Sequence, residues 1–143
     1  MILIDANLLL YAVNGAAPEH ARARDWLDKQ LTHTPRVGMP WSSLLAFLRI
    51  ATNPRVFNPP LAMSRAWKQV EAWLDIESVW IPEPTRHHRQ VLGELMQTND
   101  IRAHLVPDAH LAALAIEHGL TLCSTDGDFA KFSALKWTNP LVT

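Results

Sequence analysis

The sequence predicts an α/β fold in which a mostly parallel sheet of four to five strands lies between layers of helices. Short apolar segments rich in β-branched residues alternate along the chain with amphipathic segments of ten or more residues. Parallel strands need crossover connections that are usually helical, so this alternation is typical of a parallel sheet covered on both faces. The chain has 143 residues, which suits one domain better than two, and we expect a single domain over residues 1–143.

Each expected strand is a brief apolar run closed by polar residues or by proline. Residues 2–4, Ile-Leu-Ile, form the first run, which stops at Asp5. Pro82 and Pro84 close the third run. The strands are expected at residues 2–4, 37–39, 79–81, 120–123 and, for a short last strand, near 135–138.

Between the strands, apolar residues recur at the three- and four-residue spacing of helices. Pro40 suits a first helical position, and Ser64 suits an N-cap. The clearest helix opens at Pro107 and Asp108 and stops at Gly119. Helices are expected over residues 8–11, 19–31, 40 to about 52, 64–74, 86–96 and 107–118.

The composition excludes several classes of protein. The single cysteine, Cys123, excludes an internal disulfide and the Cys-rich zinc modules. The apolar runs are far shorter than a membrane span, and the first residues lack the features of a secretory signal. We therefore expect a soluble, cytoplasmic protein with no membrane contact.

The net charge of −1 excludes a global polycation, but it permits an acidic site in a basic surround. If Asp5, Asp108, Asp126 and Asp128 gather at one site, the rest of the chain has ten acidic and thirteen basic residues, a net charge of +3. This distribution would suit a metal-dependent enzyme that acts on a polyanion.

Aspartates follow two of the expected strands. Asp5 follows the first strand, Asp126 and Asp128 follow the fourth, and Asp108 heads the helix that leads into the fourth. Ligands of open parallel sheets bind beyond the carboxyl ends of the strands, so these acids converge if strands one and four are neighbours. Clustered carboxylates raise one another's pKa, and a bound Mg²⁺-type ion offsets that cost. Because such ions activate water at phosphodiesters, the pattern indicates phosphodiester hydrolysis.

Taken singly, each acid also fits an ordinary structural role. Asp5 with Asn7 is compatible with a polar turn, and Asp108 with a helix N-cap. The stretch 126–128, Asp-Gly-Asp, is a common turn sequence and lacks the ligand series and closing Glu of a calcium EF-hand loop. A site is therefore indicated by the shared position of these acids at strand and helix ends, and not by any one of them alone.

Three motifs, in this order along the chain, resemble a known family. They are I-x-I-D-x-N at residues 2–7, P-D-A-H-L-A-A-L-A-x-E-H-G at 107–119 and S-T-D-x-D-F-x-x-F at 124–132. The set resembles the PIN-domain ribonucleases and, more narrowly, the VapC toxins of bacterial toxin–antitoxin pairs. Residues 49–57 and 136–141 also resemble a subgroup of these toxins, so the resemblance extends from residue 2 to about residue 140.

The resemblance implies a PIN-like three-layer α/β/α sandwich and an endoribonuclease that uses Mg²⁺ or Mn²⁺. It also implies an RNA substrate and a cognate VapB-like antitoxin that wraps the toxin and blocks its active site. The implied site consists of the catalytic metal ligands Asp5, Asp108 and Asp126, the further acid Asp128, and two polar neighbours that would orient ligands or water, Asn7 and Thr125.

The chain departs from the family pattern in the helix after the second strand. Members usually carry a Glu there, whereas the best alignment puts Phe47 near that place, and residues 41–51 contain no acid. Asp100 and Asp128 are the candidates to replace the missing carboxylate. The departure leaves open a degenerate module that binds RNA or a partner without cleavage. A receiver-like phosphotransfer domain is a further alternative, although it needs a Lys at the end of a later strand.

Basic and aromatic residues outside the acidic motifs suggest contacts with RNA or with other subunits. Arg49, Arg55 and Lys131 are candidates for RNA phosphate contacts. The tryptophans at helical spacing are expected in the core or in subunit contacts, with base stacking less favoured (Trp26, Trp67 and Trp73). Several helices have apolar residues on more than one face, which suits a homodimer or a groove for a partner helix.

The seven histidines give little support to a zinc site. His110 and His118 are eight residues apart on one helix and too distant to share an ion. His118 is expected in the core or at the helix terminus, and His87 with His88 is expected as a solvated helix start.

Overall fold

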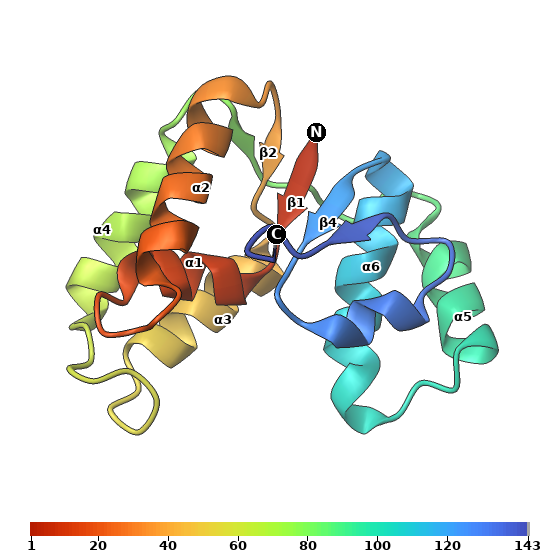
Figure 1. Cartoon of the computed structure of the whole chain (residues 1–143). Helices are drawn as coiled ribbons and strands as arrows, with labels where there is room; N and C mark the ends of the chain where they lie inside the picture. Colours follow the sequence, from red (N-terminus) through yellow and green to blue (C-terminus); the bar gives the residue numbers. More distant parts are fainter. Residues whose placement is uncertain (143) are drawn as a thin grey trace.

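The strands pair in a fully parallel five-stranded sheet. The structure, a computed structural model, describes residues 1–142 (Figure 1). The central strand β1 (Ile2–Ile4) pairs with β2 (Val37–Gly38) on one side and with β4 (Thr121–Cys123) on the other. The edge strands are β3 (Val79–Trp80) and β5 (Trp137–Thr138), so the order is β3-β2-β1-β4-β5 and the predicted fold class is confirmed.

Helices cover both faces of the sheet, as the alternation of elements predicts. One layer contains α1 (Ala6–Val13), α2 (His20–His33), α3 (Trp41–Ala51) and α4 (Met63–Leu74). The other contains α5 (His88–Thr98), α6 (Val106–His118) and the short 3-10 helices η1 (Ala103–Leu105) and η2 (Gly127–Lys131). In the described part of the chain, no helix combines the length and apolar character that crossing a bilayer requires.

The two layers arise from a reversal in strand order. The chain first builds outward from β1 through β2 to β3, and then returns to place β4 on the opposite side of β1. Because crossovers between parallel strands are right-handed, connections that run in opposite directions place their helices on opposite faces. The switch point therefore lies between β1 and β4, and ligands of such sheets bind at the carboxyl ends of the strands there.

Neighbouring residues of each central strand enter different hydrophobic cores. Ile4 and Cys123 pack into the core beneath α1 to α4, whereas Leu3 and Leu122 pack into the core beneath α5 and α6. All four side chains are at most 2% exposed. In a strand that is buried on both faces, every side chain lies in a core. These segments are therefore continuous apolar runs in the sequence.

Helix ends differ in detail from the sequence predictions. Pro40 is the N-cap of α3 rather than its first residue, and Ser64 lies inside α4, whose N-cap is Ala62. Asp108 is the third residue of α6 rather than its N-cap. Gly119 does end α6, with a left-handed φ of 67° that strains other residues.

Candidate active site

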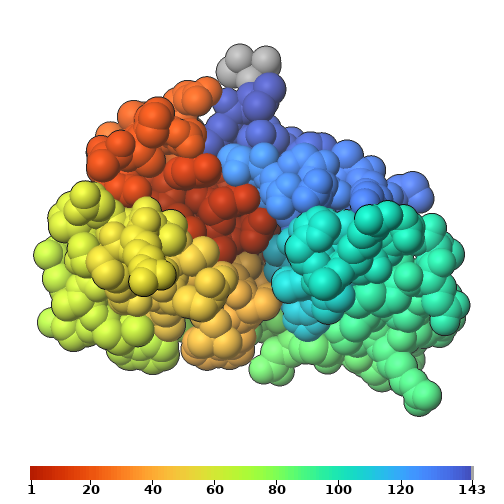
Figure 2. Space-filling model, turned by 90° about the horizontal axis from the view of Figure 1, so that it is seen from below, coloured from red at the N-terminus to blue at the C-terminus, as the bar shows by residue number. Residues whose placement is uncertain are grey.

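The carboxyl ends of β1 and β4 lie side by side at the base of the site. Ile4 pairs with Cys123, and the Asp5 N–H donates a hydrogen bond to the Cys123 carbonyl at 3.0 Å. Asp5 and Ser124 are therefore the first residues beyond two adjacent strands, so the condition for the convergence of the acids is met. Figure 2 views this edge of the molecule and shows a hollow between the red N-terminal segment and the cyan segment that leads into α6.

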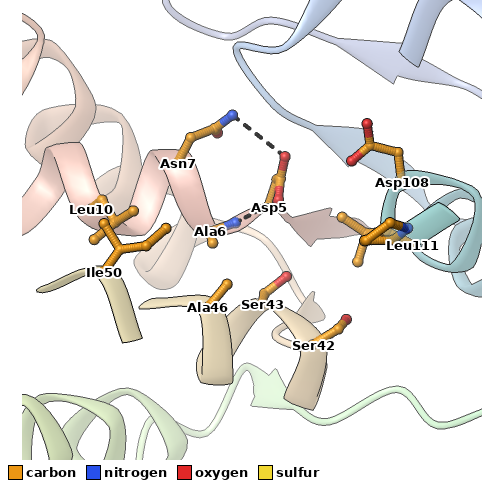
Figure 3. A pocket seen from close by; sticks show the side chains of 11 residues that line it. Asp5, Ala6, Asn7, Leu10, Ser42, Ser43, Ala46, Ile50, Asp108 and Leu111 are labelled. Atoms are coloured by element: carbon orange, nitrogen blue, oxygen red, sulfur yellow. Dashed lines mark hydrogen bonds between the residues drawn. The ribbon is translucent and has the colours of Figure 1, made fainter. Parts of the chain in front are cut away.

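A cleft of about 260 Å³ opens at this edge. Three helices form its walls: α1 directly after β1, α3 after β2, and the first turns of α6. Figure 3 shows the carboxylates of Asp5 and Asp108 on opposite sides of the cleft. The lining residues are Asp5, Ala6, Asn7 and Leu10, then Ser42, Ser43, Ala46 and Ile50, and finally Pro107, Asp108 and Leu111.

Three carboxylates from two segments converge beside the cleft. Oxygen atoms of Asp108, Asp126 and Asp128 lie within 4.8 Å of one another. Asp126 also accepts a hydrogen bond from the Asp128 N–H at 2.9 Å, which starts the turn of η2. The ion pairs found within residues 1–142 involve none of these three acids. Closely spaced carboxylates without a cationic side chain are a donor set that suits Mg²⁺ or Mn²⁺.

Asp5 lies outside this group of three, but it lines the same cleft as Asp108. Its two oxygens accept hydrogen bonds from the Ala6 N–H at 2.7 Å and from the Ser124 hydroxyl at 2.7 Å. Burial raises the pKa of Asp5 and the charge of Asp126 adds to the effect, while these hydrogen bonds act in the opposite direction. Asp5 is thus held in a fixed orientation within the field of the other acids.

Asp108 has the strongest electrostatic perturbation among the acids of the site. Burial raises its pKa, and the charges of Asp126, Asp5 and Asp128 add to the rise, which brings the pKa to about 6. A carboxylate with neighbours of its own sign favours any cation that enters the site, whether a proton or a metal ion. The donor set therefore fits a divalent cation, which would relieve the repulsion.

Ser124 joins the parts of the site, although the sequence reasoning assigned it no role. Its fully buried hydroxyl donates to Asp5 and accepts hydrogen bonds from the Asn7 side-chain amide at 3.0 Å and from the Asp126 N–H at 3.0 Å. The signals in the sequence are its place between the β4 strand and Asp126 and its position as the first residue of the motif at 124–132. A lone serine after a strand has no periodicity, so its contacts emerge only from the fold.

The two predicted polar neighbours occupy different positions. The Asn7 amide lies between Asp5, at 3.4 Å, and Ser124, and its carbonyl oxygen accepts from the Thr125 backbone N–H at 3.4 Å. The Thr125 residue itself lines a separate cavity together with Tyr11. Asn7 therefore contacts the site through its side chain, whereas Thr125 supports it through the backbone.

The α3 wall of the cleft offers hydroxyl groups and apolar side chains. Phe47 does not face the cleft: it is fully buried and packs edge-on against Trp73, with ring centroids 4.9 Å apart. Ser43 lies in the wall instead, and its hydroxyl donates to the Ile4 carbonyl at 2.8 Å. The absence of an acid from α3, noted from the sequence, thus leaves this wall without a carboxylate.

The remaining candidates lie outside the acidic cluster. Asp100 is 87% exposed and sits 3.9 Å from Arg102, so of the two proposed replacements only Asp128 joins the other acids. The three candidate RNA contacts are all exposed, on the last turn of α3, in the loop after it and at the end of η2: Arg49, Arg55 and Lys131.

These features define a parallel α/β protein with an acidic cluster at the switch point of its sheet. The family model for the PIN domain matches residues 2–135. The chain therefore belongs to the PIN-domain family, as the motifs had indicated.

Relatives extend this similarity over nearly the whole chain. The sequence is 42% identical to Ribonuclease VapC37 of Mycobacterium tuberculosis over 140 residues, covering 98% of this chain and 97% of the relative. It is 39% identical to Ribonuclease VapC33 of the same organism, covering 99% of each chain.

Solved structures share the fold at much lower identity. The M. tuberculosis toxin VapC20, described as cleaving the sarcin–ricin loop, matches with a TM-score of 0.70 and 18% identity, covering 93% of this chain and 95% of that one. VapBC-1 from nontypeable Haemophilus influenzae matches with a TM-score of 0.69 and 15% identity, covering 98% of each chain. The three-layer PIN-like architecture is thus confirmed.

Proposed function

We propose that this chain is a VapC-type endoribonuclease toxin that hydrolyses RNA phosphodiester bonds at the acidic cleft with Mg²⁺ or Mn²⁺. The observation that carries the proposal is the convergence of three carboxylates within 4.8 Å, without a basic partner in residues 1–142, at the switch point of the sheet. The names of the full-length relatives support the same activity.

Asp108, Asp126 and Asp128 would hold the cation, with Asp5 as a further catalytic ligand from the opposite side. When bound, a divalent ion supplies activation of water and neutralisation of charge at the phosphate. The chain's own contribution is orientation: Ser124 and the Ala6 N–H fix the Asp5 carboxylate, and Asn7 braces Ser124. Preorganised groups need not rearrange during the reaction, which is a large part of electrostatic catalysis.

The proposed function also implies which partners the toxin binds. Structures with this fold include the VapBC2 complex of Rickettsia felis bound to a promoter DNA fragment. We infer a VapB-like antitoxin that neutralises this chain, and exposed basic residues Arg49, Arg55 and Lys131 that guide the RNA. We further propose that residues 1–143 act as one domain, that the toxin works in the cytoplasm, and that it forms a homodimer.

Incubation of the purified chain with total RNA tests the activity directly. We expect cleavage in Mn²⁺ or Mg²⁺, and none in excess EDTA. Asp126→Asn removes one charge from the cluster and should reduce cleavage at least about 100-fold. Asp100→Asn, a matched change of an exposed acid outside the cluster, should leave cleavage unchanged. Equal activity of wild type in EDTA and in Mn²⁺ would contradict the mechanism.

A non-cleaving binding module is the second candidate, because the α3 wall lacks a carboxylate. RNA binding without metal-dependent products in the same assay would favour it. The receiver-like alternative is wrong, since the chain belongs to the PIN-domain family. Its required lysine is also missing from the strand ends in residues 1–142, where Lys136 precedes β5 and the other lysines lie in helices.

A further inference from the structure

A second cavity adjoins the acidic cleft and has a different chemical character. It measures about 290 Å³, near the lower end for small-molecule sites, and we name it the Trp41 pocket. Ser42 lines both this pocket and the acidic cleft, so the two are neighbours on the surface. The pocket is lined by Pro40, Trp41, Ser42, Pro82, Glu83, Pro84, His110 and Leu114.

The aromatic wall of the pocket is partly exposed and is stacked on a second indole ring. Trp41 is 39% exposed and stacks on Trp67, with centroids 6.5 Å apart and ring planes 8° apart. The stack restrains the Trp41 ring, and the proline rings add rigid apolar surface. An exposed, restrained indole is a platform on which planar groups stack, and nucleobases are the planar groups of the proposed substrate.

The floor of the Trp41 pocket includes an imidazole that is held by a chain of polar groups. Glu117 accepts hydrogen bonds from the Thr85 N–H at 2.9 Å and from the Thr85 hydroxyl at 2.7 Å. Its other oxygen contacts Nδ1 of His88, and Nε2 of His88 lies 3.2 Å from Nδ1 of His110. The Glu117 side chain is fully buried, so these linked hydrogen bonds are anchored inside the fold.

When both imidazoles are neutral, the carboxylate at their end sets the direction of these hydrogen bonds. With Glu117 ionised and both imidazoles neutral, His88 donates from Nδ1 and accepts at Nε2, so His110 donates from Nδ1. The remaining nitrogen, Nε2 of His110, is then an acceptor. Glu83 contributes a second acceptor to the lining. The pocket therefore offers acceptors to the edge of a planar molecule that carries amino groups.

We propose that the Trp41 pocket binds an unpaired nucleobase of the RNA substrate, next to the cleaved phosphate, by stacking on Trp41 and by amino-group hydrogen bonds to His110 and Glu83. This inference rests on the proposed ribonuclease function. Unpaired bases of RNA are commonly recognised by aromatic stacking combined with hydrogen bonds to their edges. Adenine, cytosine and guanine carry an exocyclic amino group that such acceptors select, whereas uracil carries none.

Binding of short labelled oligoadenylate, oligocytidylate and oligouridylate, followed by fluorescence anisotropy in Ca²⁺, tests the pocket without requiring cleavage. We expect tighter binding of the first two than of oligouridylate. Trp41→Ala should weaken binding about tenfold, and Glu83→Gln, which introduces a donor, should reduce the preference against uridylate. Leu45→Ala is the matched control: Leu45 is 58% exposed on the same helix but lies outside the pocket lining, so binding should stay within about twofold.

The possible failures are distinguishable. If wild type cleaves RNA with Mn²⁺ but Trp41→Ala binds all three oligonucleotides normally, the pocket proposal is overturned and the nuclease stands. If Leu45→Ala loses as much binding as Trp41→Ala, the pocket proposal is likewise overturned. A change of oligomeric state in Trp41→Ala by light scattering, with RNA binding unchanged, would assign this face to a second copy. Trp41-dependent, base-selective binding without any metal-dependent cleavage would support the pocket and overturn the proposed nuclease.

Discussion

Helix α6 carries two acids with opposite surroundings. Asp108, in its first turn, lies among carboxylates, and burial together with those charges raises its pKa to about 6. Glu117, in its last turn, is also desolvated by burial, but hydrogen bonds from Thr85 and His88 outweigh that effect and lower its pKa. One helix thus holds an acid with partners supplied by the fold and an acid without them.

This difference indicates that Glu117 contributes to the stability of the fold, whereas Asp108 belongs to a functional site. Burial of a charge is tolerated when the fold satisfies it, as at Glu117. Within the described residues, no basic side chain pairs with the acidic cluster, so a bound cation would offset its charge. A site that costs stability without a ligand is the usual mark of a functional centre. Neutralising an acid in each group should therefore have opposite consequences.

The largest expected effect is the loss of cleavage in Asp5→Asn. The substitution removes a charge while the amide oxygen still accepts one of the present hydrogen bonds, so the free energy of unfolding should change by less than about 1 kcal/mol. Cleavage of RNA in Mn²⁺ should fall at least about 100-fold. Initial rates and urea denaturation of the same preparations measure both quantities. Full activity in this variant would remove Asp5 from the catalytic set.

Glu117→Gln should have the reverse profile, a loss of stability larger than its effect on chemistry. The amide keeps one acceptor oxygen, but its NH2 group replaces the other, so it can no longer accept hydrogen bonds from both Thr85 and His88, and about 1–3 kcal/mol of unfolding free energy should be lost at neutral pH. Because the folded-state pKa is lowered, the contribution of Glu117 is present above its unfolded pKa and disappears as the pH falls through the folded value. Urea denaturation at neutral and acidic pH measures this. Asp25→Asn, at an exposed position of α2, is the control.

The comparison also shows which features the sequence can predict. The position of Asp5 follows from an apolar run that ends at an acid, and its meeting with Asp108 follows from parallel-sheet topology. The α5 helix does begin at His88, and His87 is exposed as expected. The contact of His88 with Glu117 spans 29 residues and leaves no periodic signal, so the expectation that His88 is solvated was wrong. Helical spacing likewise could not reveal that Phe47 packs against Trp73.

The N-cap of α4 and the hydrogen bonds of Ser124 depend on local backbone conformation and on strand pairing, which a sequence pattern does not specify. Ser64 has the chemistry of an N-cap, but a cap requires the extended backbone that Ala62 adopts, with φ −63° and ψ 145°. The hydroxyl of Ser124 contacts Asp5 across 119 residues of sequence. Such contacts depend on how the strands pair, which a single sequence specifies only through the whole fold.

The smallest expected effect is a pH-dependent gap in stability between wild type and Asp108→Asn, measured in EDTA. Because the folded-state pKa of Asp108 is raised from 3.8 to about 6, protonation favours the folded state. The stabilisation from that proton is fully present below the unfolded pKa and is lost as the pH rises through about 6. Asp108 is partly exposed, so solvent screening limits the effect to about 1 kcal/mol. Acidification should stabilise wild type relative to Asp108→Asn, whereas the gap between wild type and Asp100→Asn should stay constant. A gap to Asp108→Asn that does not change with pH would mean that neither burial nor the neighbouring acids raise the pKa of Asp108, and the contrast with Glu117 would then be wrong.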